Sequence, residues 1–333
     1  MLCRAVGRGL ARATRLSGGA SQETWAVDAG TGADVVPLIL RRRPASFAQR
    51  AEGERSAADG ASAGSGMAID LPTEAHLLDL AGKAGVPVPA VRQVLDPADG
   101  LGSGYLMQRL EGETIPRKVL RGAAFAEVRP HLARQCGEIL ARIHAIPVAS
   151  LPALRSAPAA VQWREYRDLY DGFDWPHPVF ELAFRWIEER LPDAAGASET
   201  LVHGDFRHGN LMIGPDGVRG VLDWELAHRG DPLEDLGWIC VNSWRFGNVD
   251  LPVGGFGRRE DLFAGYEAAG GGRVDPERVR FWEVVGSLKW GIMCMVMLSV
   301  FERGIDRSVE RAAIGRRASE AEIDLLALLE GES

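Results

Sequence analysis

The sequence predicts an α+β fold in which a small, β-rich part precedes a larger and mainly helical part. Short apolar runs bounded by Gly and Pro dominate the first hundred residues, whereas amphipathic helical periods dominate after about residue 120. A short β-rich patch at residues 200–223 interrupts the helices. We therefore expect an N-terminal lobe of residues 1–107 and a C-terminal lobe of residues 108–333.

The composition is that of an ordinary globular protein. The 333 residues are 46% hydrophobic and 25% charged, and 38 Lys and Arg against 46 Asp and Glu give a net charge of −8. Nucleic-acid binding is not expected, because it usually requires a basic excess or patch. The four cysteines lack CxxC or metal-binding spacing, which favours reduced thiols in a cytoplasmic protein. The oligomeric state is not predicted.

Two segments raise the question of targeting or membrane insertion. The Arg-rich start MLCRAVGRGLARATRL is similar to a transit peptide, but a turn-rich functional segment follows too soon to leave much for cleavage. The apolar run Val284–Phe301 approaches membrane-span length, yet Lys289 lies within it. A buried helix in a soluble protein, with no membrane partner, is the expectation.

The N-terminal part is expected to contain strands and one helix. The helix should span Leu71–Gly85, with Thr73 as its N-cap, and residues 51–66 should form a loop. Strands are expected at Thr14–Val27 (two strands around Gly18-Gly19), Val35–Arg42, Val91–Leu95 and Tyr105–Leu110.

The C-terminal part should be mostly helical. Helices are expected at Val128–Ile146 and Phe180–Leu191, with a Pro- and aromatic-rich irregular segment at 150–178 between them. Helices should resume at Asp235. Short strands are expected at Thr200–His203, Leu211–Ile213 and Val218–Asp223.

The segment LVHGDFRHGN carries the strongest chemical signal. Asp205 and Asn210 are separated by four residues, and Asp223 ends a predicted strand thirteen positions later. Mg²⁺ prefers hard oxygen ligands, which Asn210 and Asp223 supply, and Asp205 would accept the proton of an attacking hydroxyl. Asp and Asn are also common turn formers, but this ordered set matches the requirements of phosphoryl transfer.

The segments HGDFRHGNLMI and VLDWELAHRGDPLEDLGW resemble the aminoglycoside phosphotransferase family. The resemblance covers residues from about 14 to about 300 and implies a bilobal, protein-kinase-like fold. The sequence is similar both to stand-alone bacterial phosphotransferases and to the kinase-like domain fused to some acyl-CoA dehydrogenases. The resemblance implies ATP (or GTP) and Mg²⁺ as cofactors.

The resemblance assigns roles to individual residues of the loop. Asp205 matches the catalytic base, and Asn210 and Asp223 match the Mg²⁺ ligands. His203 and Asp235 would support the loop, Asp235 by accepting hydrogen bonds from its backbone. Asp231 could instead be only a helix N-cap.

The residues expected to bind the nucleotide match the family less completely than the loop residues do. Gly18, Gly19 and Ser21 lie where the phosphate-covering loop is expected, although a hairpin turn explains the glycines equally well. The phosphate-clamping Lys of the family is absent, and Arg41 or Arg43 would replace it.

Glu74 matches the partner of that clamp in the following helix. An exposed basic cluster is the alternative for the arginines. Backbone groups from Gln108 to Leu110 would contact the base.

The acceptor pocket is expected near Asp205. Possible lining residues are Arg207, His208, Trp224 and Glu225. The predicted function is ATP-dependent phosphoryl transfer to a hydroxyl of a small molecule, which could be an antibiotic, a sugar, a hydroxyacyl thioester or another metabolite. A nucleotide-binding pseudoenzyme and a metal-dependent hydrolase are the alternatives.

Overall fold

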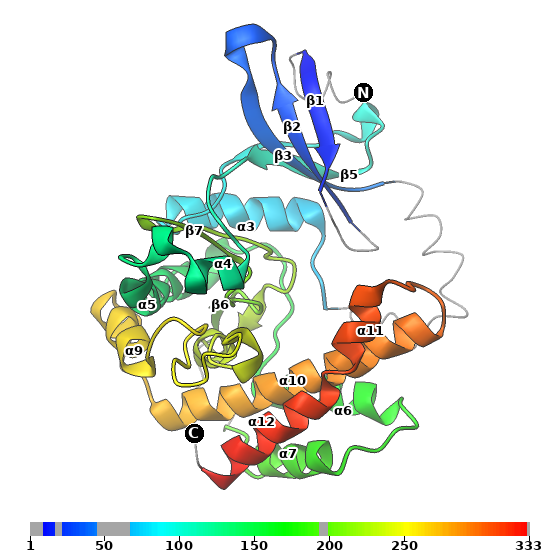
Figure 1. The fold of residues 1–333 in the computed structure, drawn as a ribbon, viewed down its shortest axis with the longest axis vertical. Helices are drawn as coiled ribbons and strands as arrows, with labels where there is room; N and C mark the ends of the chain where they lie inside the picture. The colour runs from blue at the N-terminus through cyan, green and yellow to red at the C-terminus, as the bar shows by residue number, and fades with distance from the viewer. Residues whose placement is uncertain (1–8, 17–21, 45–66, 193–198, 332–333) are drawn as a thin grey trace.

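An antiparallel sheet and a mainly helical body form the two parts of the fold (Figure 1). The computed structural model describes residues 9–16, 22–44, 67–192 and 199–331. The sheet has five strands in the order β1-β2-β3-β5-β4. Its strands are β1 (Leu10–Arg15), β2 (Glu23–Ala29), β3 (Val36–Arg43), β4 (Val91–Val94) and β5 (Ser103–Gln108). The predicted α+β class is confirmed.

Strand β3 separates two environments, because successive side chains of a strand point to opposite faces. Leu38 and Leu40 are buried with Leu106 in an apolar cluster on one face of the sheet. Ile39 packs against the main core on the other face. Arg41 follows Ile39 in this alternation and therefore points towards the helical part of the molecule.

Helix α3 (Leu71–Lys83) packs against β3, β4 and β5 beneath the sheet. It begins at Asp70, whose side chain accepts a hydrogen bond from the Thr73 amide at 2.8 Å. The expectation of Thr73 as the N-cap was therefore wrong: the carboxylate three residues earlier satisfies the free amide of the first turn. Leu77, Leu78 and Ala81 form the buried face, as their spacing predicts.

The helical part contains two short antiparallel pairs of strands, one of β6 with β9 and the other of β7 with β8. These strands are β6 (Thr200–Val202), β7 (Leu211–Gly214), β8 (Gly217–Val221) and β9 (His228–Gly230). The α-helices are α4 (Pro116–Arg121), α5 (Leu132–His144), α6 (Ala159–Asp171), α7 (Pro178–Glu188), α8 (Leu233–Trp238), α9 (Arg259–Ala268), α10 (Pro276–Glu302), α11 (Val309–Gly315) and α12 (Ala318–Glu330). Short 3₁₀ turns occur at Gly32–Asp34, Pro97–Asp99, Ala123–Phe125, Arg129–His131, Val148–Ser150 and Asn242–Trp244.

Helix α6 corrects the expectation of an irregular segment at residues 150–178. Its buried positions include Ala159, Gln162, Tyr166 and Tyr170, which follow helical spacing. Gln162 is a polar residue within this stripe. It can be buried because its side-chain amide donates to Glu234 at 2.6 Å inside the core. The apolar period is weak for that reason. Strand β9 was also not predicted.

Helix α10 contains the apolar run that approaches membrane-span length. By length and composition it could cross a membrane, but 61% of its most apolar window is buried inside the fold. Lys289 lies in this buried stretch and donates to the backbone oxygen of Gly204 at 3.0 Å. The helix therefore packs as the core helix that the sequence predicts (Figure 1).

Several expectations fall outside the described residues or stay untested. Gly18, Gly19, Ser21 and the segment 51–66 lie outside the described ranges. The lobe boundary at 107/108 stays a prediction. Cys136, Cys240 and Cys294 are buried free thiols.

Candidate active site

The backbone of the loop after β6 is hydrogen-bonded to one buried carboxylate. Asp235, which is fully buried, accepts hydrogen bonds from the amides of His203 (2.8 Å) and Gly204 (3.0 Å). The His144 ring nitrogen Nε2 lies 3.2 Å from the same carboxylate. Burial opposes ionisation of Asp235, but its hydrogen bond and charge interaction with His144 lower the pKa. The loop backbone is thus fixed by an ionised side chain.

Gly204 allows the chain to turn sharply in this loop. Its φ of 77° lies in the left-handed region, and a Cβ there would meet the Leu226 oxygen at 2.5 Å. His203 stabilises the same turn, because its Nδ1 accepts from the Asp205 amide (3.2 Å) and its Nε2 lies 3.2 Å from the Leu222 oxygen. Burial lowers the pKa of His203, so the ring is neutral and Nε2 carries the proton.

Asp205 presents its carboxylate at the end of this turn. Its Oδ1 accepts from Nε1 of Trp238 (2.9 Å) and from Nε of Arg207 (3.0 Å). Its Oδ2 accepts from Nδ2 of Asn210 at 2.6 Å. Because Asn210 uses its amide nitrogen here, its Oδ1 faces away from Asp205, and no described residue donates to that oxygen.

Asp223 follows the end of β8 and is brought to Asn210 by the backbone. The Leu222 amide donates to the backbone oxygen of Asn210 at 2.8 Å. This hydrogen bond joins the two segments one residue before Asp223. Asp223 has a φ of 65°, which is unusual outside glycine. Its side chain is 34% exposed and, among the described residues, accepts a hydrogen bond from Arg41 alone. Asn210 and Asp223 thus lie at adjoining points of one site.

Arg41 links the sheet to this site. Its Nη1 contacts Glu74 of α3 at 2.9 Å, and its Nη2 contacts Asp223 at 3.2 Å. Burial opposes the guanidinium charge, but the Glu74 carboxylate together with Tyr105, Asp223 and Glu225 raises the pKa of Arg41. Glu74 is 1% exposed and also accepts from the Trp224 amide at 3.2 Å. Arg41, and not Arg43, therefore occupies the position facing the expected metal ligands.

Glu225 forms a second carboxylate beside Asp223. Its Oε2 accepts from the side-chain amide of Gln22 (3.2 Å) and lies 4.0 Å from Nη2 of Arg41. Gln22 also accepts from Arg41 at 2.9 Å. Burial, reinforced by the charge of Asp223, raises the pKa of Glu225 to about 7. These contacts tie the start of β2 to the helical part of the molecule.

Two of the expected pocket residues lie in the core. Trp224 is fully buried and donates through Nε1 to the Val221 oxygen at 3.2 Å. His208 is fully buried, contacts the Gly254 oxygen through Nδ1 at 2.6 Å and packs against Phe256. Both side chains pack in the core under the loop, and neither is exposed beside Asp205. Arg207 and Glu225 remain partly exposed beside Asp205 and Asp223.

The segment after β5 lies at the junction of the two parts. The Gln108 amide donates to the Ala90 oxygen at 2.9 Å, so that amide is already used within the sheet. In the described part of the chain, no hydrogen bond is formed by the backbone of Leu110. Leu110 therefore keeps free backbone groups, as contact with a nucleotide base would require.

Two residues that contact the loop were not predicted from the sequence. Trp238 contacts Asp205 from α8, and Lys289 contacts the loop backbone from α10. Lys289 had one available signal, a charge within an apolar run. Trp238 had none, because a single sequence does not show which loop a helical tryptophan reaches.

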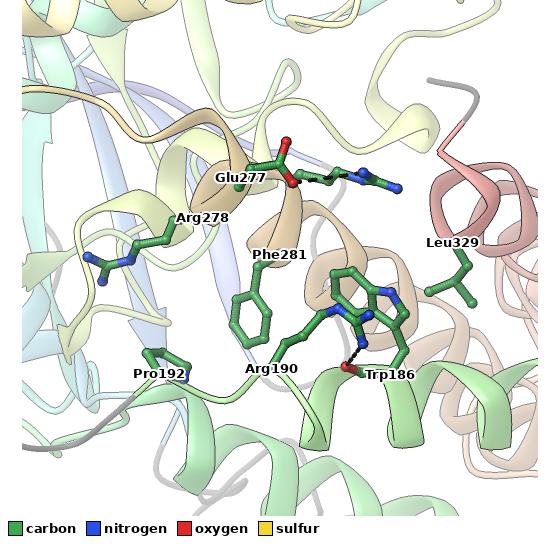
Figure 2. A pocket seen from close by; sticks show the side chains of 8 residues that line it. Trp186, Arg190, Pro192, Glu277, Arg278, Phe281 and Leu329 are labelled. Carbon is green, nitrogen blue, oxygen red and sulfur yellow. Dashed lines mark hydrogen bonds and ion pairs between the residues drawn. The ribbon is translucent and has the colours of Figure 1, made fainter.

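A pocket of about 460 Å³ lies elsewhere, between α7, the start of α10 and α12. Figure 2 shows the Phe281 ring between the side chains of Arg278 and Arg190, with the Arg190 guanidinium over the Trp186 ring. Arg278 pairs with Asp231, and Arg190 donates to the Trp186 oxygen. The pocket contains none of the predicted site residues.

The antiparallel sheet, the helical body and the loop between them define a protein-kinase-like fold. The sequence pattern of the phosphotransferase enzyme family matches residues 12–282. The chain belongs to this phosphotransferase family.

Curated relatives are longer proteins. The Arabidopsis thaliana protein named acyl-CoA dehydrogenase IBR3 is 27% identical over 267 residues, covering 76% of this chain and 29% of the relative. Acyl-CoA dehydrogenase family member 10 of Mus musculus is 31% identical over 182 residues, covering 51% of this chain and 16% of the relative. The chain thus spans less than a third of either protein.

Solved structures share the fold at low sequence identity. A Ralstonia eutropha protein named as an aminoglycoside phosphotransferase has a TM-score of 0.73 and 18% identity, covering 97% of this chain and 93% of that one. A choline/ethanolamine kinase family protein of Mesorhizobium loti has a TM-score of 0.63 and 21% identity, with 96% and 88% covered. A spectinomycin phosphotransferase bound to ADP and spectinomycin has a TM-score of 0.64 and 12% identity, with 98% and 96% covered.

Proposed function

We propose that the protein transfers the γ-phosphate of ATP (or GTP) to a hydroxyl group of a small molecule. Asp205 is the proposed base, and Asn210 and Asp223 are the proposed Mg²⁺ ligands. The observation that carries the proposal is the Asp205 carboxylate, held by three hydrogen-bond donors beside the junction of Asn210 and Asp223.

The donor set fits magnesium. Asn210 keeps its Oδ1 free of described donors, and Asp223 offers a partly exposed carboxylate. Both are hard oxygen ligands, and few protein ligands suit an ion that keeps water and phosphate in its shell. When bound, Mg²⁺ would neutralise charge on the phosphate oxygens.

The chain's own residues then perform three tasks. Arg41 supplies a fixed positive charge next to Asp223, where phosphate oxygens are expected, and Glu74 holds the guanidinium in place. Asp205 accepts the proton of the attacking hydroxyl as the oxygen bonds to phosphorus. Asp235 keeps the loop backbone from moving during this step. His203 stabilises the turn that presents Asp205.

The nucleotide would lie between the sheet and the helical part. The ADP complex of the spectinomycin phosphotransferase supports this proposal through the shared fold. Backbone groups around Leu110 are the proposed contacts of the base, and Gly18, Gly19 and Ser21 the proposed phosphate-covering loop. The lobe boundary at 107/108 belongs to the same proposal.

The acceptor class stays open between several hydroxyl compounds. Arg207 offers a positive charge and Glu225 a carboxyl group whose pKa is raised to about 7, whereas polycationic antibiotics would favour a mainly acidic pocket. Asp171, which could have served such a pocket, pairs with Arg167 within α6. The relatives named as acyl-CoA dehydrogenases support including hydroxyacyl thioesters among the tested acceptors. A cytoplasmic location is proposed with this function.

The test is a coupled assay of ADP release. The acceptor panel contains aminoglycosides, a macrolide, sugars, choline, homoserine and hydroxyacyl thioesters, with Asp205→Ala as the blank. Acceptor-dependent ADP release by the wild type alone supports the proposal. Mg²⁺-dependent nucleotide binding without release for any acceptor would favour the alternative, a nucleotide-binding pseudoenzyme in which Arg41 replaces the usual Lys.

A further inference from the structure

We infer that Trp238 is a positioning residue, which orients the Asp205 carboxylate and leaves Oδ2 as the oxygen that accepts the proton. This inference rests on the proposed function of Asp205. It follows from the hydrogen bonds of the carboxylate, from the packing around the indole and from a neighbouring tryptophan that lacks the same contact.

The two oxygens of the Asp205 carboxylate accept different numbers of hydrogen bonds. A carboxylate oxygen accepts about two hydrogen bonds. Oδ1 already accepts from Trp238 (2.9 Å) and Arg207 (3.0 Å), whereas Oδ2 accepts only from Asn210 (2.6 Å) among the described side chains. The open acceptor position therefore lies on Oδ2. In the proposed reaction the hydroxyl proton moves to Oδ2 while the hydroxyl oxygen bonds to phosphorus and the bond from phosphorus to the nucleoside diphosphate breaks.

Helix α8 holds the loop at two points. Asp235 binds the backbone amides of His203 and Gly204, and Trp238 binds the side chain of Asp205. The two residues are three positions apart on one helix, so their side chains lie on the same face. Backbone and carboxylate are thus fixed relative to the same rigid element.

The indole itself has little freedom. Trp238 is 4% exposed, and the Lys289 ammonium lies 4.4 Å from the centroid of its ring. Lys289 also donates to the Gly204 oxygen at 3.0 Å. A Cβ at Gly286, on the same helix as Lys289, would approach Cε3 of the indole to 2.9 Å, so α10 packs directly against the ring. A ring held in this way sets the direction of its N–H donor.

Trp244 provides the matched comparison. It is also 4% exposed and packs against Trp238, with ring centroids 5.2 Å apart. Its Nε1 is buried without a hydrogen-bond partner in the described structure. The two tryptophans therefore pack against each other but differ in the contact with Asp205. The Arg207 guanidinium lies 4.6 Å from the Trp244 ring, a contact that the ring of a phenylalanine can keep.

Phenylalanine at each position separates packing from positioning. Both Trp238→Phe and Trp244→Phe keep an aromatic ring and lose one N–H. We expect Trp238→Phe to lower kcat by roughly 10- to 100-fold, the scale expected for a misplaced catalytic group, with the KM for the nucleotide unchanged. Trp244→Phe should retain the kcat of the wild type. Equal kcat values for the two variants, at similar melting temperatures, would overturn the inference.

A second measurement needs no turnover. In ¹⁵N-tryptophan-labelled protein, the Trp238 indole N–H signal is identified by its loss in Trp238→Phe, and the Trp244 signal by its loss in Trp244→Phe. Asp205→Ala should shift the Trp238 signal upfield, because the charged acceptor is removed, and leave the Trp244 signal in place. An unchanged Trp238 signal would show that the contact is absent.

The two readouts separate the possible failures. If no acceptor supports ADP release, the proposed function fails, while the indole shift still tests the placement of Trp238 on Asp205. If turnover depends on Asp205 but not on the Trp238 N–H, the proposed function stands and the positioning role is excluded.

Discussion

Arg41 and Asp223 are joined across the two parts of the molecule, with Nη2 of the guanidinium 3.2 Å from Oδ1 of the carboxylate. The other end of the same guanidinium contacts Glu74 at 2.9 Å. A lysine has a single nitrogen and lacks this planar fork, so Arg41 makes two directed contacts that a lysine would not reproduce together. The proposed phosphate clamp is thereby connected to a proposed metal ligand.

Removing the Arg41 charge should destabilise the protein. Arg41→Met leaves Glu74 buried without its partner, and breaking a buried ion pair costs about 3–5 kcal/mol. Urea denaturation should show this loss in the free energy of unfolding. The double variant Arg41→Met/Glu74→Leu should recover most of it, because the unpaired charge is then absent.

Lys83→Met is the control for Arg41→Met. Lys83 pairs with Asp79 on the exposed surface of α3, where ion pairs contribute little. Equal effects of Lys83→Met and Arg41→Met on unfolding would contradict the proposed importance of the buried pair.

Asp223 should control the metal dependence of nucleotide binding. Asp223→Gly suits the left-handed backbone at φ 65° and removes the side-chain oxygens, whereas alanine would add backbone strain. We expect Mg²⁺ to strengthen ATP binding to the wild type in isothermal titration calorimetry, and EDTA to remove the gain. Asp223→Gly should lose this gain, and the same gain in that variant would exclude Asp223 as a ligand.

His208 should make stability depend on pH. Burial lowers its pKa to about 4, from 6.5 in the unfolded chain, so the folded protein favours the neutral ring. Its contribution is present above pH 6.5 and is lost as the pH falls towards 4, because the unfolded state then binds the additional proton. The shift corresponds to about 3 kcal/mol.

His208→Asn keeps an N–H that can reach the Gly254 oxygen but cannot titrate. The difference in unfolding free energy between variant and wild type should therefore change across pH 4–6.5 and stay constant above it. Parallel pH profiles for the two proteins would show that the buried ring does not titrate as described.

The sequence led to much of the active-site loop because its chemistry is local. Asp205 and Asn210 are five residues apart, and Val221 and Leu222 directly precede Asp223 at the end of a predicted strand. The alternation in β3 also made Arg41 a candidate for the inward face. These features depend on neighbouring residues, which a single sequence displays.

Other features depend on tertiary contacts and were missed or misplaced. The stripe of α6 includes Gln162, whose burial is explained by Glu234 seventy-two residues away. Thr73 was predicted to cap α3, whereas the cap is Asp70, because the helix begins three residues earlier than that prediction requires. Trp238 reaches Asp205 across thirty-three residues, a contact that no local pattern indicates.

The most direct test of the account is the turnover of Asp205→Ala with an acceptor identified in the ADP-release screen. We predict that kcat falls by about 10²–10⁴, the usual contribution of a positioned base, while Mg²⁺-dependent ATP affinity stays at the wild-type value. Turnover equal to that of the wild type would contradict the assignment of Asp205 as the base.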